Sequence, residues 1–205
     1  ALLANTSRIH IYSTVHVPVF HPVATAKMGA TLDHIGKGRW GLNIVSGWSE
    51  HEFGMMGIDV MPHAERYQRT AAYIEILKGL WTEPPGTFNF ECPWYTITNG
   101  NVRPQPTAMP HPTIANAGVS EDAKDLVSKW CDWAFISPPS VAEAPAVVAD
   151  IKTRAATQQR AVQCACYPFV LWRDSAEEAE RERRRVVENI DRVAVDNWAR
   201  GLNIQ

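Results

Sequence analysis

The chain has 205 residues, of which 45% are hydrophobic and 20% are charged. This composition is that of an ordinary globular protein, and the length suffices for one domain with a sizeable core. A formal net charge of −2 excludes the strongly basic surface that nucleic acids or anionic membranes attract. No apolar run approaches the ~20 residues of a membrane-spanning helix. We therefore expect neither nucleic acid nor membrane as a partner.

Four cysteines are spread along the chain, at Cys92, Cys131, Cys164 and Cys166. The last two are separated by a single residue. This is not the CxxC spacing of a redox site, and no second pair completes a zinc-binding pattern. We therefore expect structural thiols in a reducing cytoplasm, and no metal site.

Residues 8–15 alternate as a strand with two different faces does. One face carries Ile9, Ile11 and Ser13, and the other carries His10, Tyr12 and Thr14. Because helices cover the apolar faces of parallel sheets, a polar face is expected only toward a barrel interior or a site. We therefore predict that His10, Tyr12 and Thr14 face inward. A helix over 23–35 should follow, because Pro22 precedes it and Gly36 ends it.

The run from Arg39 to Ser46 is mostly apolar and bounded by glycines, which is typical of a strand buried on both faces. Asn43 stands in its middle, and a buried amide without hydrogen-bond partners costs about 1–3 kcal/mol. Asn43 therefore either faces a polar site or binds the backbone of a neighbouring strand. A polar loop follows, and this layout places sites at the carboxyl ends of strands in α/β barrels.

The remaining pattern alternates strands with helices. It predicts a loop over 51–62, a helix over 64–81, a β-hairpin over 88–102 with Asn99-Gly100 at its turn, a strand over 113–117, a helix over 121–131 capped by Ser120, a strand over 133–137, a helix over 141–157, a strand over 162–171 and one charged helix over 176–198. Five core strands alternating with helices indicate a parallel α/β fold.

Four segments together resemble one family: 6–14 (TSRIHIYST), 30–48 (ATLDHIGKGRWGLNIVSGW), 65–67 (ERY) and 116–120 (NAGVS). They are similar to the bacterial luciferase-like flavin-dependent monooxygenases, in particular to the branch of pyrimidine, dimethylsulfone and alkanesulfonate monooxygenases. The likeness spans essentially the whole chain. It implies a TIM (β/α)8 barrel of which this chain covers about strands 3 to 7, with a β-hairpin excursion near 88–102. Residues 1–205 would then be a single domain without the first two strands and the last strand, and Thr14 and Asn43 would lie on the concave side.

The resemblance also implies site residues. Thr14 and Asn43 match the threonine and asparagine that line the flavin and oxygen pocket, and both side chains can donate hydrogen bonds to an oxygen anion. The other matches are cofactor-binding positions: Glu52 in the loop, the pair Arg66 and Tyr67, and the phosphate-binding turn formed by Ser120 with the backbone N–H groups of Gly118 and Val119. In isolation, Ser120 is more often only a helix cap and Arg66 a surface ion-pair partner.

By this resemblance the protein is a two-component monooxygenase that uses reduced FMN, supplied by a separate flavin reductase, and O2 to oxygenate a small organic substrate. It is expected to form a homo-oligomer. Two alternatives stay open. One is a deazaflavin-dependent oxidoreductase of the same superfamily, and the other is a flavin-binding barrel protein without catalysis. The identity of the substrate does not follow from the residues.

Overall fold

The structure is a computed structural model, and it describes residues 1–138, 140–166 and 170–201. The chain divides into two compact units, 1–166 and 167–205, and each is described by itself. The first contains α1 (Leu2–Asn5), β1 (Ile11–His16), α2 (Pro22–Gly36), β2 (Trp40–Val45), α3 (Glu50–Met55), α4 (His63–Thr82), β3 (Phe88–Glu91), β4 (Thr96–Gly100), β5 (Thr113–Asn116), α5 (Glu121–Trp130), β6 (Trp133–Phe135), α6 (Ala144–Thr157) and β7 (Gln163–Ala165). The second contains α7 (Ala176–Glu188) and α8 (Arg192–Gly201).

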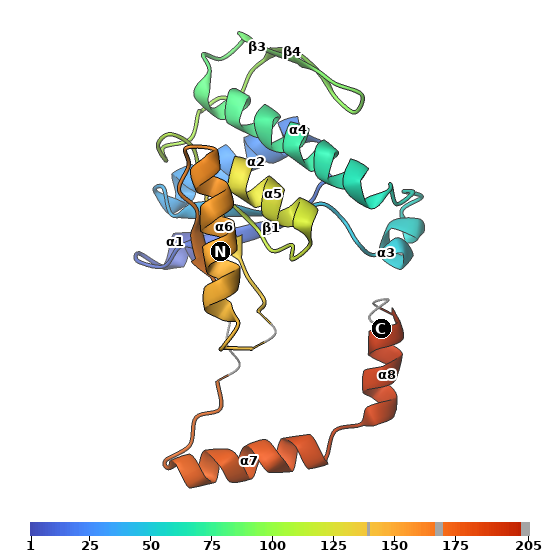
Figure 1. Ribbon diagram of the computed structural model, residues 1–205. Coiled ribbons are helices and arrows are strands. Elements are labelled where there is room, and N and C mark those ends of the chain that lie inside the picture. The colour runs from blue at the N-terminus through green and yellow to red at the C-terminus, as the bar shows by residue number, and fades with distance from the viewer. Residues whose placement is uncertain (139, 167–169, 202–205) are drawn as a thin grey trace. The chain divides into compact units, whose positions relative to one another are not determined.

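Five strands of the first unit form one sheet in the order β1-β2-β5-β6-β7, and each neighbouring pair is parallel. The order in the sheet follows the order in the chain, and helices connect successive strands (Figure 1). β3 and β4 form a separate antiparallel hairpin between α4 and β5. The structure thus confirms the predicted parallel α/β arrangement of five core strands with a hairpin excursion.

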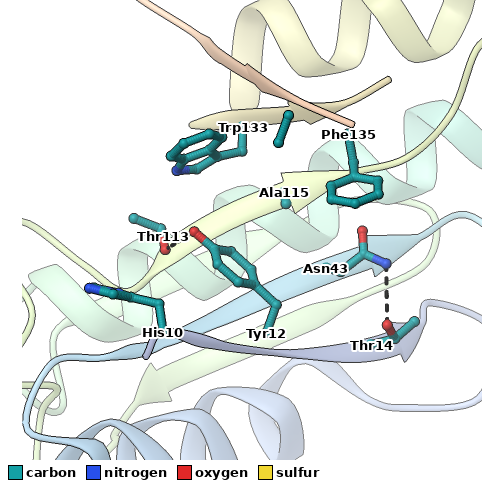
Figure 2. Close-up of a pocket in the computed structure, with 9 residues that line it drawn as sticks. His10, Tyr12, Thr14, Asn43, Thr113, Ala115, Trp133 and Phe135 are labelled. Carbon is teal, nitrogen blue, oxygen red and sulfur yellow. Dashed lines mark hydrogen bonds between the residues drawn. The ribbon is translucent and has the colours of Figure 1, made fainter. Parts of the chain in front are cut away.

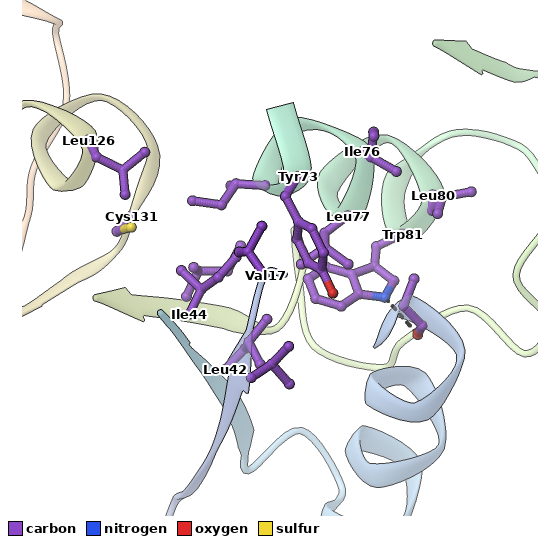
Figure 3. Packing of buried hydrophobic residues seen from close by; sticks show 14 of the residues in the cluster. Val17, Leu42, Ile44, Tyr73, Ile76, Leu77, Leu80, Trp81, Leu126 and Cys131 are labelled. Atoms are coloured by element: carbon purple, nitrogen blue, oxygen red, sulfur yellow. Dashed lines mark hydrogen bonds between the residues drawn. The ribbon is translucent and has the colours of Figure 1, made fainter. Parts of the chain in front are cut away.

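The helices bury one face of the sheet. The centre of the apolar cluster consists of Leu42, Ile44, Ile114, Tyr73 and Leu77, all fully buried (Figure 3). Because side chains alternate along a strand, the residues between the buried ones point to the opposite face. Asn43, between Leu42 and Ile44, is therefore on that opposite face, together with Tyr12 and Thr14. The polar face of β1 is thus opposite the buried layer, and its orientation into a barrel interior stays a prediction.

The cysteines differ in their surroundings. All four are free thiols. Burial raises the pKa of the Cys131 thiol to about 12, so this group stays protonated and serves as an apolar packing residue. Cys166 is exposed, so the expectation of a structural thiol does not fit that position.

The segment predicted as a loop over 51–62 begins instead as helix α3. Its N-cap is Ser49, whose hydroxyl accepts a hydrogen bond from the backbone N–H of Glu52 at 3.2 Å. Ser49 and Glu52 have the spacing of a capping box, which satisfies backbone groups that the first helical turn leaves free. Methionine favours a helix, and a glycine costs only about 1 kcal/mol relative to alanine, so the residues that suggested a loop do not prevent α3.

The hairpin has its turn at a different place from the predicted one. The chain reverses between β3 and β4, where the N–H of Cys92 donates to the carbonyl of Tyr95 at 2.9 Å. Asn99 lies within β4 at a φ of +51°, where the strand register shifts. The left-handed residue that suggested a turn serves a β-bulge instead.

The charged segment near the C-terminus forms two helices instead of the single predicted one. Asn189 ends α7 with its side-chain N–H donated to the carbonyl of Arg185 at 2.7 Å, and Asp191 accepts from the N–H of Ala194 at 3.0 Å. Such short polar side chains compete with helical hydrogen bonds and favour helix ends.

The predicted strand over 162–171 is also shorter than expected. Val170 and Leu171 lie in no strand, and 167–169 fall outside the described residues.

Close packing between α4 and the hairpin generates a stability prediction. A Cβ at Gly79 in α4 would lie 2.1 Å from the Phe88 ring. Alanine favours a helix over glycine by about 1 kcal/mol, but overpacking a core costs about 1–3 kcal/mol. We expect Gly79→Ala to lower the free energy of unfolding in urea denaturation. The control is Gly54→Ala in α3, where a Cβ meets nothing within 4 Å. That variant should be neutral or stabilised, and equal effects at both positions would contradict the packing argument.

Candidate functional site

The open face of the sheet carries a cavity of about 580 Å³. Its lining is His10, Tyr12, Thr14, Asn43, Thr113, Ala115, Trp133, Phe135 and Ala165 (Figure 2). Every strand of the sheet contributes at least one of these residues. The cavity is polar over β1 and β2 and mainly apolar over β6 and β7, so it suits a flat ligand with one polar edge.

Thr14 and Asn43 are partners in this cavity. They occupy facing positions in the register of β1 and β2, and Nδ2 of Asn43 donates to Oγ1 of Thr14 at 3.2 Å. The bond leaves the hydroxyl hydrogen of Thr14 available to a ligand, because a hydroxyl can accept and donate at once. Oδ1 of Asn43 is buried, and no partner for it is found within the described part of the chain. The amide of Asn43 thus binds a side chain of the neighbouring strand, and its role in a polar site stays a prediction.

Tyr12 lies flat against the neighbouring strand. Its hydroxyl is 2.8 Å from Oγ1 of Thr113, and its ring covers Gly41, where a Cβ would lie 2.5 Å from the ring. The absence of a side chain at Gly41 therefore allows the ring to approach the sheet closely. Tyr12 forms one wall of the cavity as a result.

A second cavity, of about 390 Å³, lies at the carboxyl ends of β2 and β5 beside the start of α4. Its lining is Val45, Ser46, Gly47, Trp48, His63, Arg66, Tyr67, Asn116, Ala117, Gly118, Val119 and Ser120. Five positions singled out from the sequence come together here, two from α4 and three from the turn before α5. These segments are about fifty residues apart in the chain, and the fold makes them neighbours.

Arg66 lines this cavity and has no ion-pair partner among the described residues. Its Nη1 donates to the carbonyl of Gly47. Its Nε is buried and has no hydrogen-bond partner among those residues. A buried donor left unpaired costs free energy. A ligand that accepts this hydrogen bond would therefore recover that free energy on binding. The reading of Arg66 as a surface ion-pair residue does not fit this geometry.

The turn before α5 is tightly held. The N–H of Gly118 donates to Oδ1 of Asn116 at 2.8 Å, and a Cβ at Gly118 would lie 2.8 Å from the Tyr67 hydroxyl. Glycine is therefore required where the turn meets α4, but its N–H is already used within the protein. Ser120 caps α5 by accepting from the N–H of Ala123 at 3.3 Å. Its own hydroxyl hydrogen remains available, so the cap and ligand roles of Ser120 are compatible.

Glu52 stands apart from the other predicted site residues. It is exposed in the first turn of α3 and lines neither cavity. Its backbone N–H donates to the Ser49 hydroxyl that caps α3.

The sequence analysis singled out neither Asn116 nor His63. Asn116 is buried, and its Nδ2 donates to the carbonyl of Ile44 at 2.7 Å while its Oδ1 holds the Gly118 N–H. An asparagine that directly ends a strand before a Gly-x-Ser turn is a signal for such an Asx turn. His63 lines the second cavity and pairs with Asp122.

The described residues contain neither a metal-binding cluster nor a membrane-spanning helix. No group of three or more His, Cys, Asp and Glu side chains among them could hold a metal ion. None of their helices has both the length and the apolar character needed to cross a membrane.

Comparison with known proteins places the chain in a family. The model of the luciferase-like monooxygenase family matches residues 1–203. The FMNH(2)-dependent dimethylsulfone monooxygenase of Pseudomonas putida is 35% identical over 198 residues, which are 97% of this chain and 54% of that protein. The pyrimidine monooxygenase RutA of Serratia proteamaculans (strain 568) is 33% identical over 192 residues, 89% of this chain and 50% of that protein. The chain therefore belongs to the luciferase-like monooxygenase family.

Solved structures agree on the fold. DmoA from Hyphomicrobium sulfonivorans superimposes with a TM-score of 0.79 at 24% identity, over 91% of this chain and 45% of that chain. A riboflavin lyase, RcaE, gives a TM-score of 0.82 at 22% identity, over 91% of this chain and 47% of that chain. The α/β fold thus matches luciferase-like TIM-barrel structures over about half of their length, and the chain spans about half the length of the curated relatives it matches.

The double hydrogen bond of Asn116 generates a second prediction. Asn116→Asp keeps the shape but cannot donate to the Ile44 carbonyl, so a buried acceptor loses its partner at a cost of about 1–3 kcal/mol. Asn89→Asp is a matched control, because Asn89 also donates to one backbone carbonyl and accepts from one backbone N–H but is exposed. We expect denaturant unfolding to show a large decrease in the free energy of unfolding for Asn116→Asp. The decrease for Asn89→Asp should be small. Similar losses would mean that Asn116 does not hold the two segments together.

Proposed function

We propose that this protein is a two-component flavin-dependent monooxygenase, which uses reduced FMN and O2 to oxygenate a small organic substrate. The observation that carries the proposal is the convergence of Arg66, Tyr67 and Ser120 in one cavity at the carboxyl end of the sheet. Family membership supports it, since curated relatives are FMNH(2)-dependent monooxygenases by name. The proposal includes a flavin reductase that supplies reduced FMN, and a homo-oligomeric assembly.

The proposed architecture is a TIM (β/α)8 barrel in which this sheet forms about strands 3 to 7. The likeness to luciferase-like barrel structures over about half of their length supports this assignment. In such barrels, ligands bind at the carboxyl ends of the strands. The second cavity lies at the ends of β2 and β5, as that assignment requires.

The residues of the second cavity fit the phosphate of FMN. The buried Nε of Arg66 lacks a partner within the described part of the chain, and a phosphate oxygen would supply an acceptor in a charge-assisted bond. Ser120 presents its free hydroxyl hydrogen at the N-terminus of α5, where the helix dipole favours an anion. Of the two backbone N–H groups named from the sequence, only that of Val119 remains a candidate, because Asn116 holds that of Gly118.

The residues of the first cavity would position O2 and the substrate. Bound reduced FMN supplies the electrons that activate O2. The Thr14 hydroxyl, oriented by Nδ2 of Asn43, would donate to an oxygen species that develops negative charge. The apolar side chains over β6 would exclude water. In the overall reaction, reduced FMN, O2 and the substrate give oxidised FMN, an oxygenated product and water.

A direct assay tests the function. The full-length protein is supplied with a flavin reductase, FMN, NADH and a panel of sulfones, sulfonates and pyrimidines, with and without O2. We expect an oxygenated product from at least one compound, with ¹⁸O incorporated from ¹⁸O2. Oxidation of a substrate without O2 would instead indicate a hydride-transferring deazaflavin enzyme. Release of only hydrogen peroxide in every reaction would indicate a flavin-binding protein without oxygenation.

The oxygen pair generates a third prediction. Thr14→Ala and Asn43→Ala should retain FMN binding, because neither residue lines the second cavity, but each should slow oxygenation. The loss of one preorganised donor costs about 3 kcal/mol of barrier, or roughly a hundredfold in rate. Thr113→Ala is a control that removes another hydroxyl from the same cavity without touching the pair. Wild-type rates in both alanine variants of the pair would remove Thr14 and Asn43 from the mechanism.

Ser120 generates a fourth prediction, which separates a helix cap from a ligand. Ser120→Ala should lower stability by about 1 kcal/mol whatever the protein binds. If Ser120 also binds the phosphate, the affinity for FMN should fall by about ten- to a hundredfold. Riboflavin has no phosphate, so its affinity should hardly change. Both affinities are measured by fluorescence quenching, and equal weakening for the two flavins would leave Ser120 only as a cap.

A further inference from the structure

The rim of the second cavity carries a histidine paired with an aspartate. His63 is the first residue of α4 and lines the cavity. Its Nδ1 donates to Oδ2 of Asp122 in the first turn of α5, at 2.7 Å. Asp122 does not line this cavity. The pair therefore joins the starts of the two helices beside the Arg66 and Ser120 side chains.

The pairing fixes the direction of the imidazole ring. An aspartate that accepts from Nδ1 sets the ring orientation and leaves Nε2 as the atom that can serve a ligand. No partner for Nε2 is found among the described residues. The ring of Tyr67 packs beside the imidazole with 5.0 Å between ring centroids, which restricts its movement further. His63 is thus held with one nitrogen unused, although its side chain is 49% exposed.

The charges near this rim give His63 a second role, which is to compensate the charge of Asp122. Two acids stand in the first turn of α5. Glu121 is compensated by Lys124 at 2.7 Å and by Arg154 at 2.5 Å. Asp122 has His63 as its one ion-pair partner within the described ranges. Without His63, the carboxylate of Asp122 would stand uncompensated next to a cavity proposed to take an anion, and like charges repel.

We propose that His63 is a further phosphate-binding side chain of this cavity, and that Asp122 holds it in place. The ligand class is a phosphate monoester, whose oxygens accept a hydrogen bond from Nε2–H of the imidazolium form, in which both ring nitrogens carry a proton. This inference rests on the proposed function and adds a residue to it. Because Asp122 acts through His63 alone, it is a positioning residue and not a ligand contact.

Flavin affinity in the full-length protein tests the role of His63. His63→Ala should weaken FMN binding by about tenfold, as expected for the loss of one charge-assisted hydrogen bond. Riboflavin binding should stay within about twofold, because an unphosphorylated flavin cannot reach that bond. His51→Ala is the matched control, since His51 is an exposed histidine on α3 that lines neither cavity. Thermal unfolding of each variant confirms that it is folded.

A double-mutant cycle tests the role of Asp122. Asp122→Asn keeps an acceptor for Nδ1 and should leave FMN affinity at or above that of the wild type. Asp122→Ala removes the acceptor and should weaken FMN several-fold more than riboflavin. In the His63→Ala background, Asp122→Ala should cause no further loss and should restore part of the FMN affinity, because it removes the uncompensated carboxylate. An equal loss in both backgrounds would show that Asp122 acts only by stabilising α5 and would overturn its positioning role.

The outcomes separate this inference from the proposed function. Wild-type protein that binds neither FMN nor riboflavin overturns both. Wild-type protein that prefers FMN over riboflavin, together with an unchanged preference in His63→Ala, overturns only the role of His63. Selective loss of FMN affinity in His63→Ala, with no loss in His51→Ala, supports the inference.

Discussion

The register of the parallel sheet is the constraint on which the candidate site depends. Thr14 of β1 faces Asn43 of β2, and Asn43 faces Ala115 of β5. Because facing residues of parallel strands point to the same side, these three side chains share one row on the open face. A shift of one residue would place Asn43 in the apolar layer and Leu42 in the cavity. The apolar packing beneath the sheet thus keeps the polar pair in position.

The two cavities differ in their chemistry. The cavity on the sheet face is built on strands, so its polar pair is held by the backbone register. The cavity at the strand ends is built on two helix starts and one turn, where unpaired backbone N–H groups and helix dipoles favour anions. Its side chains add hydrogen-bond donors with unused capacity, above all the buried Nε of Arg66. A ligand with a flat ring at one end and a phosphate at the other matches this division.

The sequence predicted the strands and their faces because alternation and burial are local properties of β1 and β2. The sequence also predicted that Arg66 and Ser120 bind the same cofactor. This prediction came only from the family resemblance, because more than fifty positions separate the two residues in the chain. The sequence-based predictions were wrong where one residue type is compatible with two local structures. Asn99 has a left-handed conformation that fits a hairpin turn or a bulge, and pairing across strands decides between them. The bond between His63 and Asp122 joins two helices whose relative placement no local pattern encodes.

Asn116 links the two cavities through a single side chain. Its amide nitrogen holds the carbonyl of Ile44, the residue that follows Asn43, and its amide oxygen holds the turn that contains Gly118. The separation between the polar pair and the turn before α5 is therefore set by covalent geometry and by two hydrogen bonds of one buried side chain. Such a connection is rigid. For the proposed FMN site, it would fix the distance between the flavin ring and the phosphate.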